Sequence, residues 1–174
     1  MKTKENIVFL GMMGSGKTTI GTLISKKLKL DFHDTDHYIE NKLGLKISKI
    51  FQEKGEKFFR ECEEEITLEL LKKKEVVIAL GGGAFINKKI RNEILDNHLS
   101  FWLKWDHRIL VDRIKNSSKR PIAFNSPKKD LFDLVKKRSN IYSKALYTIN
   151  CNTLSKNKLV NKIIDIYETN KINC

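Results

Sequence analysis

One segment of this sequence carries the residue types that bind nucleotide phosphates. Gly11–Thr18 reads GMMGSGKT, which matches the pattern GxxxxGK[ST] and lies between an apolar run and a helical pattern. Its glycines allow backbone N–H groups to point inward around a phosphate chain. Lys17 can reach the β- and γ-phosphates, and the Thr18 hydroxyl can ligate Mg²⁺. The loop predicts binding of a nucleoside triphosphate such as ATP, but it does not specify the reaction.

Two further clusters follow the next two expected strands. Asp34 and Asp36 lie two residues apart, so in extended chain both carboxylates would face one cleft, near a metal ion and an attacking hydroxyl. Alternatively, one of the two aspartates caps the helix expected near His37. Gly81, Gly82 and Gly83 come directly after an apolar run, where backbone amides could approach a ligand or simply form a tight turn.

Arginine is scarce in this chain, since only six of the 34 basic residues are arginines. Arginine is the residue that forms a planar, two-pronged contact with a carboxylate or phosphate. Arg60 lies three residues before Glu63, which could hold its guanidinium in place on a helix. Arg138 precedes Tyr142 by four residues, and Arg120 lies in a polar stretch where a lid would be expected. Each arginine by itself could equally be surface charge.

The elements that must position these residues alternate along the chain. Apolar runs predict five strands, at Asn6–Leu10, Asp31–Thr35, Val76–Leu80, Leu99–Trp105 and Tyr147–Asn150. Amphipathic patterns predict helices over Lys17–Leu28, His37–Leu43, Ser48–Lys54, Lys57–Lys73, Asn87–Asp96, Asp106–Lys115, Asp130–Lys144 and Ser155–Thr169. This alternation predicts an α/β protein with a parallel sheet between helix layers. Ligands of such sheets lie at the carboxyl ends of the strands.

Composition limits the class of protein. The 174 residues suit one domain, and no apolar run approaches the roughly 20 residues of a membrane span. The net charge of +13 comes mostly from scattered lysines, which indicates a solvated surface and no nucleic-acid partner. The three cysteines, Cys62, Cys151 and Cys174, are expected to be free thiols. We expect a cytoplasmic monomer.

Taken in order, these motifs resemble those of the shikimate kinase family. GMMGSGKT is followed by DTD at Asp34–Asp36, FRxxE at Phe59–Glu63, LGGGA at Leu80–Ala84, RP at Arg120-Pro121 and RxxxY at Arg138–Tyr142. The phosphate-binding loop is shared with many kinases, whereas the combination is specific, and it spans essentially the whole chain. Ile122-Ala123 departs from the family, which usually has two leucines there.

The resemblance implies a three-layer P-loop kinase fold with sheet order 2-3-1-4-5 and a mobile lid at about residues 116–129 of a single domain, 1–174. It implies transfer of the γ-phosphoryl group of ATP to the 3-hydroxyl of shikimate, on the route to chorismate and the aromatic amino acids. The implied site residues fall into three groups. Gly14, Ser15, Gly16, Lys17, Thr18, Thr19, Arg113 and Arg120 would bind ATP; Thr18 and Asp34 would hold Mg²⁺, Asp34 through water; and Asp36, Arg60, Gly81, Gly82 and Arg138 would bind shikimate. Lys17, Asp34, Asp36 and Arg120 would be catalytic.

Two alternatives remain at this stage. A different small-molecule kinase of the same fold, acting on gluconate or a nucleoside monophosphate, would share the loop and the sheet. A non-enzymatic nucleotide or nucleic-acid binder would use the positive charge and would bind polynucleotide in a salt-sensitive way. The sequence has no recognition motif or interleaved aromatics that favour such a binder.

Overall fold

The computed structural model of the protein describes residues 5–115 and 126–172. Five strands are present in this part of the chain: β1 (Ile7–Leu10), β2 (Asp31–Asp34), β3 (Val76–Ala79), β4 (Leu99–Lys104) and β5 (Tyr147–Asn150). The helices are α1 (Lys17–Leu28), α2 (Thr35–Leu43), α3 (Ile47–Leu71), α4 (Lys88–Asn97), α5 (His107–Lys115), α7 (Lys128–Tyr142) and α8 (Lys156–Ile172), with a short 3₁₀ helix η1 at Ala84–Ile86. Arg120 and Ile122-Ala123 lie outside the described residues.

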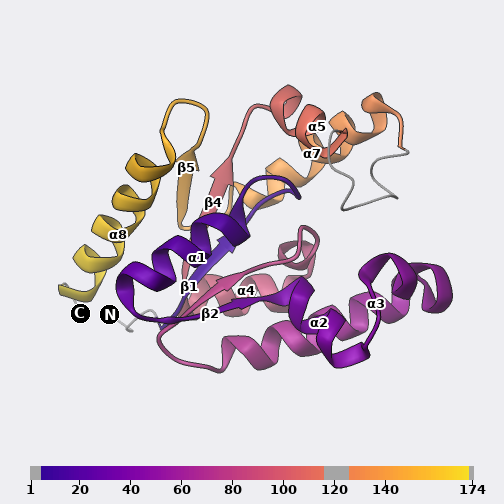
Figure 1. The fold of residues 1–174 in the computed structure, drawn as a ribbon, viewed down its shortest axis with the longest axis horizontal. Helices are drawn as coiled ribbons and strands as arrows, with labels where there is room; N and C mark the ends of the chain where they lie inside the picture. The colour runs from indigo at the N-terminus through magenta and orange to yellow at the C-terminus, as the bar shows by residue number, and fades with distance from the viewer. Residues whose placement is uncertain (1–4, 116–125, 173–174) are drawn as a thin grey trace.

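The strands form one parallel sheet in the order β2-β3-β1-β4-β5, which confirms the predicted topology. Val8 in the central strand lies opposite Ile78 of β3 and Ser100 of β4. Because all the strands run in the same direction, their carboxyl ends meet along one edge. The loop after β1 therefore lies between the segments that follow β3 and β4 (Figure 1).

Helices cover both faces of the sheet, and the strands explain why. Alternate residues of a strand point to opposite faces. Ile7 and Phe9 of β1 accordingly join one core with residues of α1 and α8, and Val8 and Leu10 join the other core. The second core is built with α3, α4, α5 and α7 (Figure 1). Burial on both faces accounts for the continuous apolar runs of the central strands.

Most helix boundaries differ by one to three residues from those predicted, and three of these differences have a clear structural cause. α3 is one element of 25 residues, but Gly55 inside it has φ 81° and ψ 170°, so the chain breaks where the sequence predicts two helices. α2 begins at Thr35, earlier than predicted, because Asp34 caps it. α7 begins at Lys128 behind Pro127, so the last residues of the predicted lid are helical instead of irregular.

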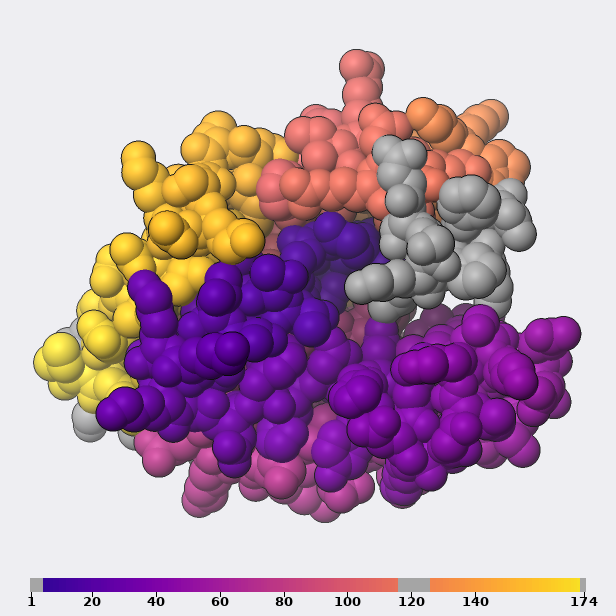
Figure 2. All heavy atoms as spheres, in the orientation of Figure 1, coloured from indigo at the N-terminus to yellow at the C-terminus, as the bar shows by residue number. Residues whose placement is uncertain are grey.

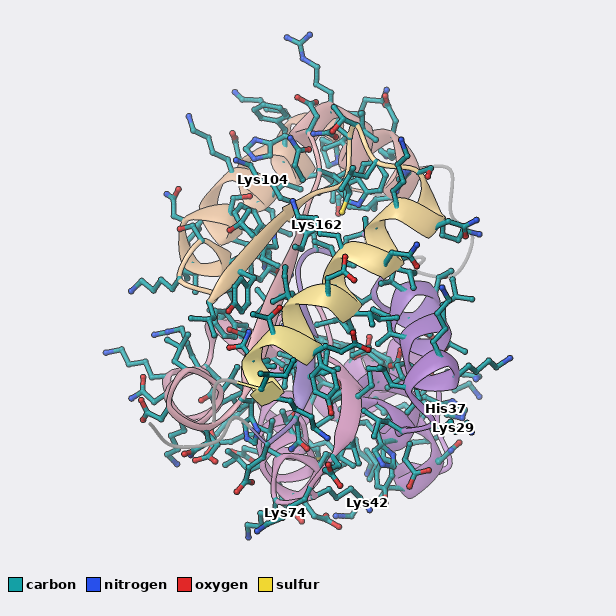
Figure 3. All side chains as sticks on the ribbon, turned by 90° about the vertical axis from the view of Figure 1, so that its left-hand side faces the viewer. Lys29, His37, Lys42, Lys74, Lys104 and Lys162 are labelled. Carbon is teal, nitrogen blue, oxygen red and sulfur yellow. The ribbon has the colours of Figure 1, made fainter. Side chains whose placement is uncertain are left out.

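The surface lysines come from many elements. Lys29, Lys42, Lys74, Lys104 and Lys162 are exposed and are spread over the length of the face shown in Figure 3. Among the described residues, no helix has the length and hydropathy needed to cross a membrane. Cys62 and Cys151 are free, and Cys174 lies outside the described residues.

Candidate active site

The loop after β1 forms a compact turn at the carboxyl edge of the sheet. Gly14 and Gly16 have positive φ values of 77° and 93°, which a residue with a side chain would adopt at a cost in free energy. The ammonium group of Lys17 donates to the carbonyl oxygens of Gly11 at 2.9 Å and Met12 at 3.0 Å. The Ser15 hydroxyl is buried and has no hydrogen-bond partner within residues 5–115 and 126–172. Hydrogen-bond donors of the loop are therefore gathered at one point.

Asp34 links the end of β2 to the start of α1. Its Oδ2 accepts a hydrogen bond of 2.7 Å from the Thr18 hydroxyl. Its Oδ1 accepts from the backbone N–H groups of Asp36 at 3.1 Å and His37 at 3.3 Å, which caps α2. The predicted cap is confirmed and uses one carboxylate oxygen, while the other oxygen faces Thr18 of the loop; the role of Asp34 beside a metal ion stays a prediction.

Asp36 lies in the first turn of α2, so the expectation that it shares an extended segment with Asp34 is wrong. It still reaches the predicted cleft. A Cβ atom built on Gly81 would collide with Asp36 Oδ1 and would lie 2.8 Å from Glu63 Oε1. The backbone of Gly81 therefore lies so close to both carboxylates that a residue with a side chain would not fit there.

The backbone N–H of Gly81 is used within the protein. It donates to the hydroxyl of Thr35 at 2.7 Å, and Thr35 is fully buried. This bond joins the start of α2 to the end of β3. Because its N–H is bonded to Thr35, Gly81 does not present a free amide to a ligand in this arrangement, contrary to its expected role. The N–H of Gly82, in contrast, donates no such bond within the described chain.

Arg60 projects from α3 over the third glycine. Its Nη1 lies 2.6 Å from Glu63 Oε2, and its Nε and Nη2 donate to Glu56 Oε1 at 3.2 and 3.1 Å. Burial lowers the pKa of Arg60, but the two carboxylates outweigh burial and raise it. A Cβ atom on Gly83 would collide with Arg60 Nη1. The pairing with Glu63, predicted from the spacing, is confirmed.

Glu63 is the buried charge at the centre of this group. Its side chain is 4% exposed, and burial raises its pKa, with a further rise from Asp36. Arg60 and Arg138 act in the opposite direction and lower its pKa. The same carboxyl thus lies within electrostatic reach of Asp36, Arg60 and Arg138, which come from α2, α3 and α7. Three of the residues that the sequence assigned to the acceptor, Asp36, Arg60 and Arg138, therefore lie around one buried carboxyl.

Arg138 and Tyr142, one turn apart on α7, hold the same carbonyl. Arg138 Nη1 donates to Gly82 O at 3.2 Å and lies 3.8 Å from the sulfur of Met12. The hydroxyl of Tyr142 also donates to Gly82 O. Burial raises the pKa of Tyr142 to about 12, so this phenol stays protonated and remains a donor at neutral pH. The RxxxY spacing positions the segment after β3 against α7.

Arg113 and Trp105 form the opposite flank of the loop. The guanidinium carbon of Arg113 lies 3.6 Å from the ring centroid of Trp105. The indole N–H of Trp105 donates to Ser15 O at 2.9 Å. Trp105 was not among the predicted site residues, because it lay at the end of the predicted strand Leu99–Trp105. An aromatic residue at the carboxyl end of an apolar run was the signal that could have found it.

The site residues therefore surround the loop. Asp34, Asp36, Arg60, the glycines and Arg138 lie on the side of β2 and β3, and Arg113 lies on the side of β4. Figure 2 shows the surface of α2 and α3 below and that of α5 and α7 above. Arg120 falls outside the described residues, so its predicted position stays a prediction.

A phosphate-binding loop at the carboxyl edge of a parallel sheet, with a hydroxyl–carboxylate pair beside it, defines the class of P-loop nucleotide-binding proteins. The sequence model of the shikimate kinase family, described as "Shikimate kinase", matches residues 13–168. The chain therefore belongs to the shikimate kinase family.

Individual relatives agree with this assignment. The chain is 40% identical over 162 residues to a shikimate kinase of Bartonella quintana, covering 92% of this chain and 77% of that protein. It is 36% identical to a shikimate kinase of Thermodesulfovibrio yellowstonii, with coverage of 94% and 95%. A solved shikimate kinase of Acinetobacter baumannii in complex with shikimate superposes with a TM-score of 0.88 at 34% identity, covering 98% of this chain and 96% of the other.

Proposed function

We propose that this protein transfers the γ-phosphoryl group of ATP to the 3-hydroxyl of shikimate, which gives shikimate 3-phosphate and ADP. The observation that carries the proposal is the single cleft beside the phosphate-binding loop, where Asp36 and Arg138 lie around the same buried carboxyl, Glu63. A substrate with one carboxylate and several hydroxyls suits a pair of guanidiniums together with a hydrogen-bonding carboxylate. The relative solved with shikimate supports the choice of acceptor.

The phosphates of ATP are assigned to the loop and the first turn of α1, residues 14–19. Lys17, now bonded to two loop carbonyls, would exchange these for β- and γ-phosphate oxygens. The helix start adds a partial positive charge at the same place. Transfer of a phosphoryl group needs little covalent help from the protein, so positioning and charge neutralisation by these donors account for most of the catalysis. Arg120 is assigned the same charge-neutralising role from the lid.

The residues beside the loop suit Mg²⁺. Thr18 and Asp34 offer oxygen ligands, which Mg²⁺ prefers, and they already meet at 2.7 Å. In the described chain, no three His, Cys, Asp or Glu side chains gather in a metal-binding cluster. Mg²⁺ is commonly held by one or two protein groups together with water and substrate phosphates. When bound, the ion neutralises charge on the β- and γ-phosphates.

The acceptor is assigned to the other side of the loop. Asp36 would accept a hydrogen bond from the reacting hydroxyl and orient its oxygen toward the γ-phosphorus. Arg60 and Arg138 would bind the carboxylate and ring hydroxyls, with the N–H of Gly82. Gly81 contributes its lack of a side chain instead of its amide, because that amide is bonded to Thr35.

A coupled assay of ADP release tests the reaction. Shikimate, gluconate and nucleoside monophosphates are compared at equal concentrations with ATP and Mg²⁺, and each reaction is repeated with excess chelator. We expect turnover with shikimate only, and its loss on chelation. Turnover with another acceptor only would refute the assignment of the substrate while leaving a kinase. Full activity in the presence of chelator would refute the metal site.

The proposal includes a single-domain enzyme, residues 1–174, that acts as a monomer in the cytoplasm. The two free cysteines of the described chain are consistent with a reducing compartment. Sedimentation at micromolar concentration tests the oligomeric state, since a dimer would sediment at twice the monomer mass of 20.2 kDa.

A further inference from the structure

Trp105 lies at the junction of β4 and α5, immediately after the last residue of the strand. It is half-buried and packs against both hydrophobic cores of the protein. The backbone N–H that follows it, on Asp106, donates to the side chain of Asn152 at 2.9 Å. The backbone at Trp105 is therefore fixed by β4 on one side and by the loop after β5 on the other, and its ring packs on both cores.

The face of the indole carries Arg113. A distance of 3.6 Å from the guanidinium carbon to the ring centroid is van der Waals contact, which only stacking on the ring face allows. Cation–π contact with tryptophan is the most favourable of its kind. Arg113 is an exposed residue whose side chain would otherwise sample many rotamers. Stacking on Trp105 limits these rotamers and leaves the opposite face of the guanidinium available to a planar group.

The edge of the same indole holds the phosphate-binding loop. Its N–H donates to the carbonyl of Ser15, the residue just before Gly16, where φ is 93°. The N–H of Ser15 in turn donates to Met12 O at 3.2 Å, which closes the turn. The Cβ of Arg113 would lie 3.7 Å from a Cβ on Gly14, so the arginine and the loop also approach each other directly. One side chain thus fixes both the loop and the arginine beside it.

We propose that Trp105 is a positioning residue for ATP, which it prepares in two ways. Its N–H fixes the loop for the phosphates, and its ring holds in place Arg113, the arginine that the family resemblance already assigns to the adenine of ATP. The three groups would lie in layers, with indole first, guanidinium second and adenine third. This inference rests on the proposed use of ATP, but not on the identity of the acceptor.

Two ligands separate the two effects. Inorganic tripolyphosphate uses the loop alone, whereas ATP uses the loop and the base support. Trp105→Phe keeps an aromatic face and removes the N–H, so both dissociation constants should rise by the same factor, about fivefold. Trp105→Leu removes the face as well. In this variant the dissociation constant of tripolyphosphate should again rise about fivefold, and that of ATP should rise about 20-fold in total. Both constants are measured by calorimetry with Mg²⁺ and no acceptor.

Steady-state kinetics provide the second measurement. Because Trp105 contacts no reacting group, both variants should raise the KM for ATP while kcat and the KM for shikimate stay within about twofold. Phe132→Leu is a matched control, since it also replaces an aromatic side chain by leucine, and this exposed residue of α7 packs edge-on against His107. It should change none of these constants. Trp105→Met replaces the leucine variant if that variant does not fold.

The outcomes are distinct. If the dissociation constants of ATP and tripolyphosphate rise by the same factor in Trp105→Leu, the role of the ring in supporting the base is refuted. If the dissociation constant of tripolyphosphate is unchanged in Trp105→Phe, the role of the indole N–H is refuted. A parallel rise in the KM for shikimate would show a general loss of structure and overturn the proposal. Because the binding measurements need no acceptor, failure of the enzyme to phosphorylate shikimate would leave this test intact.

Discussion

A substitution at Gly83 perturbs the acceptor side of the site without replacing any residue that is assigned to bind the substrate. Its backbone has φ −103° and ψ −20°, which residues with side chains adopt readily. A Cβ atom there would collide with Arg60 Nη1 and would lie 2.9 Å from its Cζ and 3.1 Å from its Nη2. Gly83→Ala therefore introduces no backbone strain and displaces one guanidinium.

The size of each effect follows from this geometry. Replacing glycine by alanine in a permitted conformation stabilises a protein by about 0.4–1 kcal/mol, and the displaced group is the movable end of a side chain. Partial loss of the contact between Arg60 and Glu63 acts in the other direction, so the melting temperature should change by less than about 3 °C. A misplaced charge-assisted hydrogen bond costs about 1.5 kcal/mol or more. The KM for shikimate should therefore rise about tenfold or more.

The assay is initial-rate kinetics with each substrate varied in turn, together with a melting curve. The KM for ATP should not change, because Arg60 lies on the acceptor side of the loop. Arg60→Lys and the double variant complete a cycle. Since lysine has no fork to displace, Gly83→Ala should have little further effect in that background. Additive losses, or an unchanged KM for shikimate in Gly83→Ala, would refute the argument that this glycine makes room for the guanidinium.

Three further changes probe the neighbouring groups. Asp36→Ala should reduce turnover below detection while ATP affinity changes less than about threefold, as measured by calorimetry, and retained turnover would contradict its assigned role. Arg138→Lys keeps the charge but loses the planar guanidinium, whose Nη1 donates to Gly82 O, so the KM for shikimate should rise about tenfold in the coupled assay, and an unchanged KM would count against the role assigned to Arg138. The pKa of Tyr142 is raised to about 12 by burial, so the unfolded state ionises first and the fold should lose stability between about pH 10 and 12. In denaturant titrations over that pH range, Tyr142→Phe should lose less free energy of unfolding than the unmodified protein, and equal losses would refute the raised pKa of Tyr142.

The fold could be predicted from the sequence because its signals are local. The central strands are apolar runs buried on both faces, and α1 has the bounds that its periodicity predicts, Lys17–Leu28. Gly55 divides α3 at the point where the amphipathic pattern of the sequence is interrupted between two helical segments. The position of the phosphate-binding loop followed from the motif together with the strand before it and the helix after it.

Details of the site depended on tertiary contacts that no motif contains. The sequence could not show that Asp34 uses one oxygen as a cap and the other for Thr18, because this requires α1 and β2 to lie side by side. It could not show that the hydroxyl of Thr35 takes the amide of Gly81, since these residues are 46 positions apart. Trp105 is a single aromatic with no accompanying pattern, and only its contacts with Ser15 and Arg113 distinguish it.

The place of β1 between β3 and β4 has a consequence for how such enzymes can change. The groups assigned to the acceptor come from segments that follow β2 and β3, together with α7, whereas Arg113 and Trp105 follow β4. Among the described residues, the loop after β1 belongs to both neighbourhoods, and so does α7, which packs on α5 and carries Arg138 to Gly82. A lineage could therefore exchange its acceptor by altering α7 and the segments after β2 and β3, while keeping Arg113 and Trp105 for the nucleotide. A change of acceptor specificity then requires substitutions in a limited set of segments and not throughout the protein.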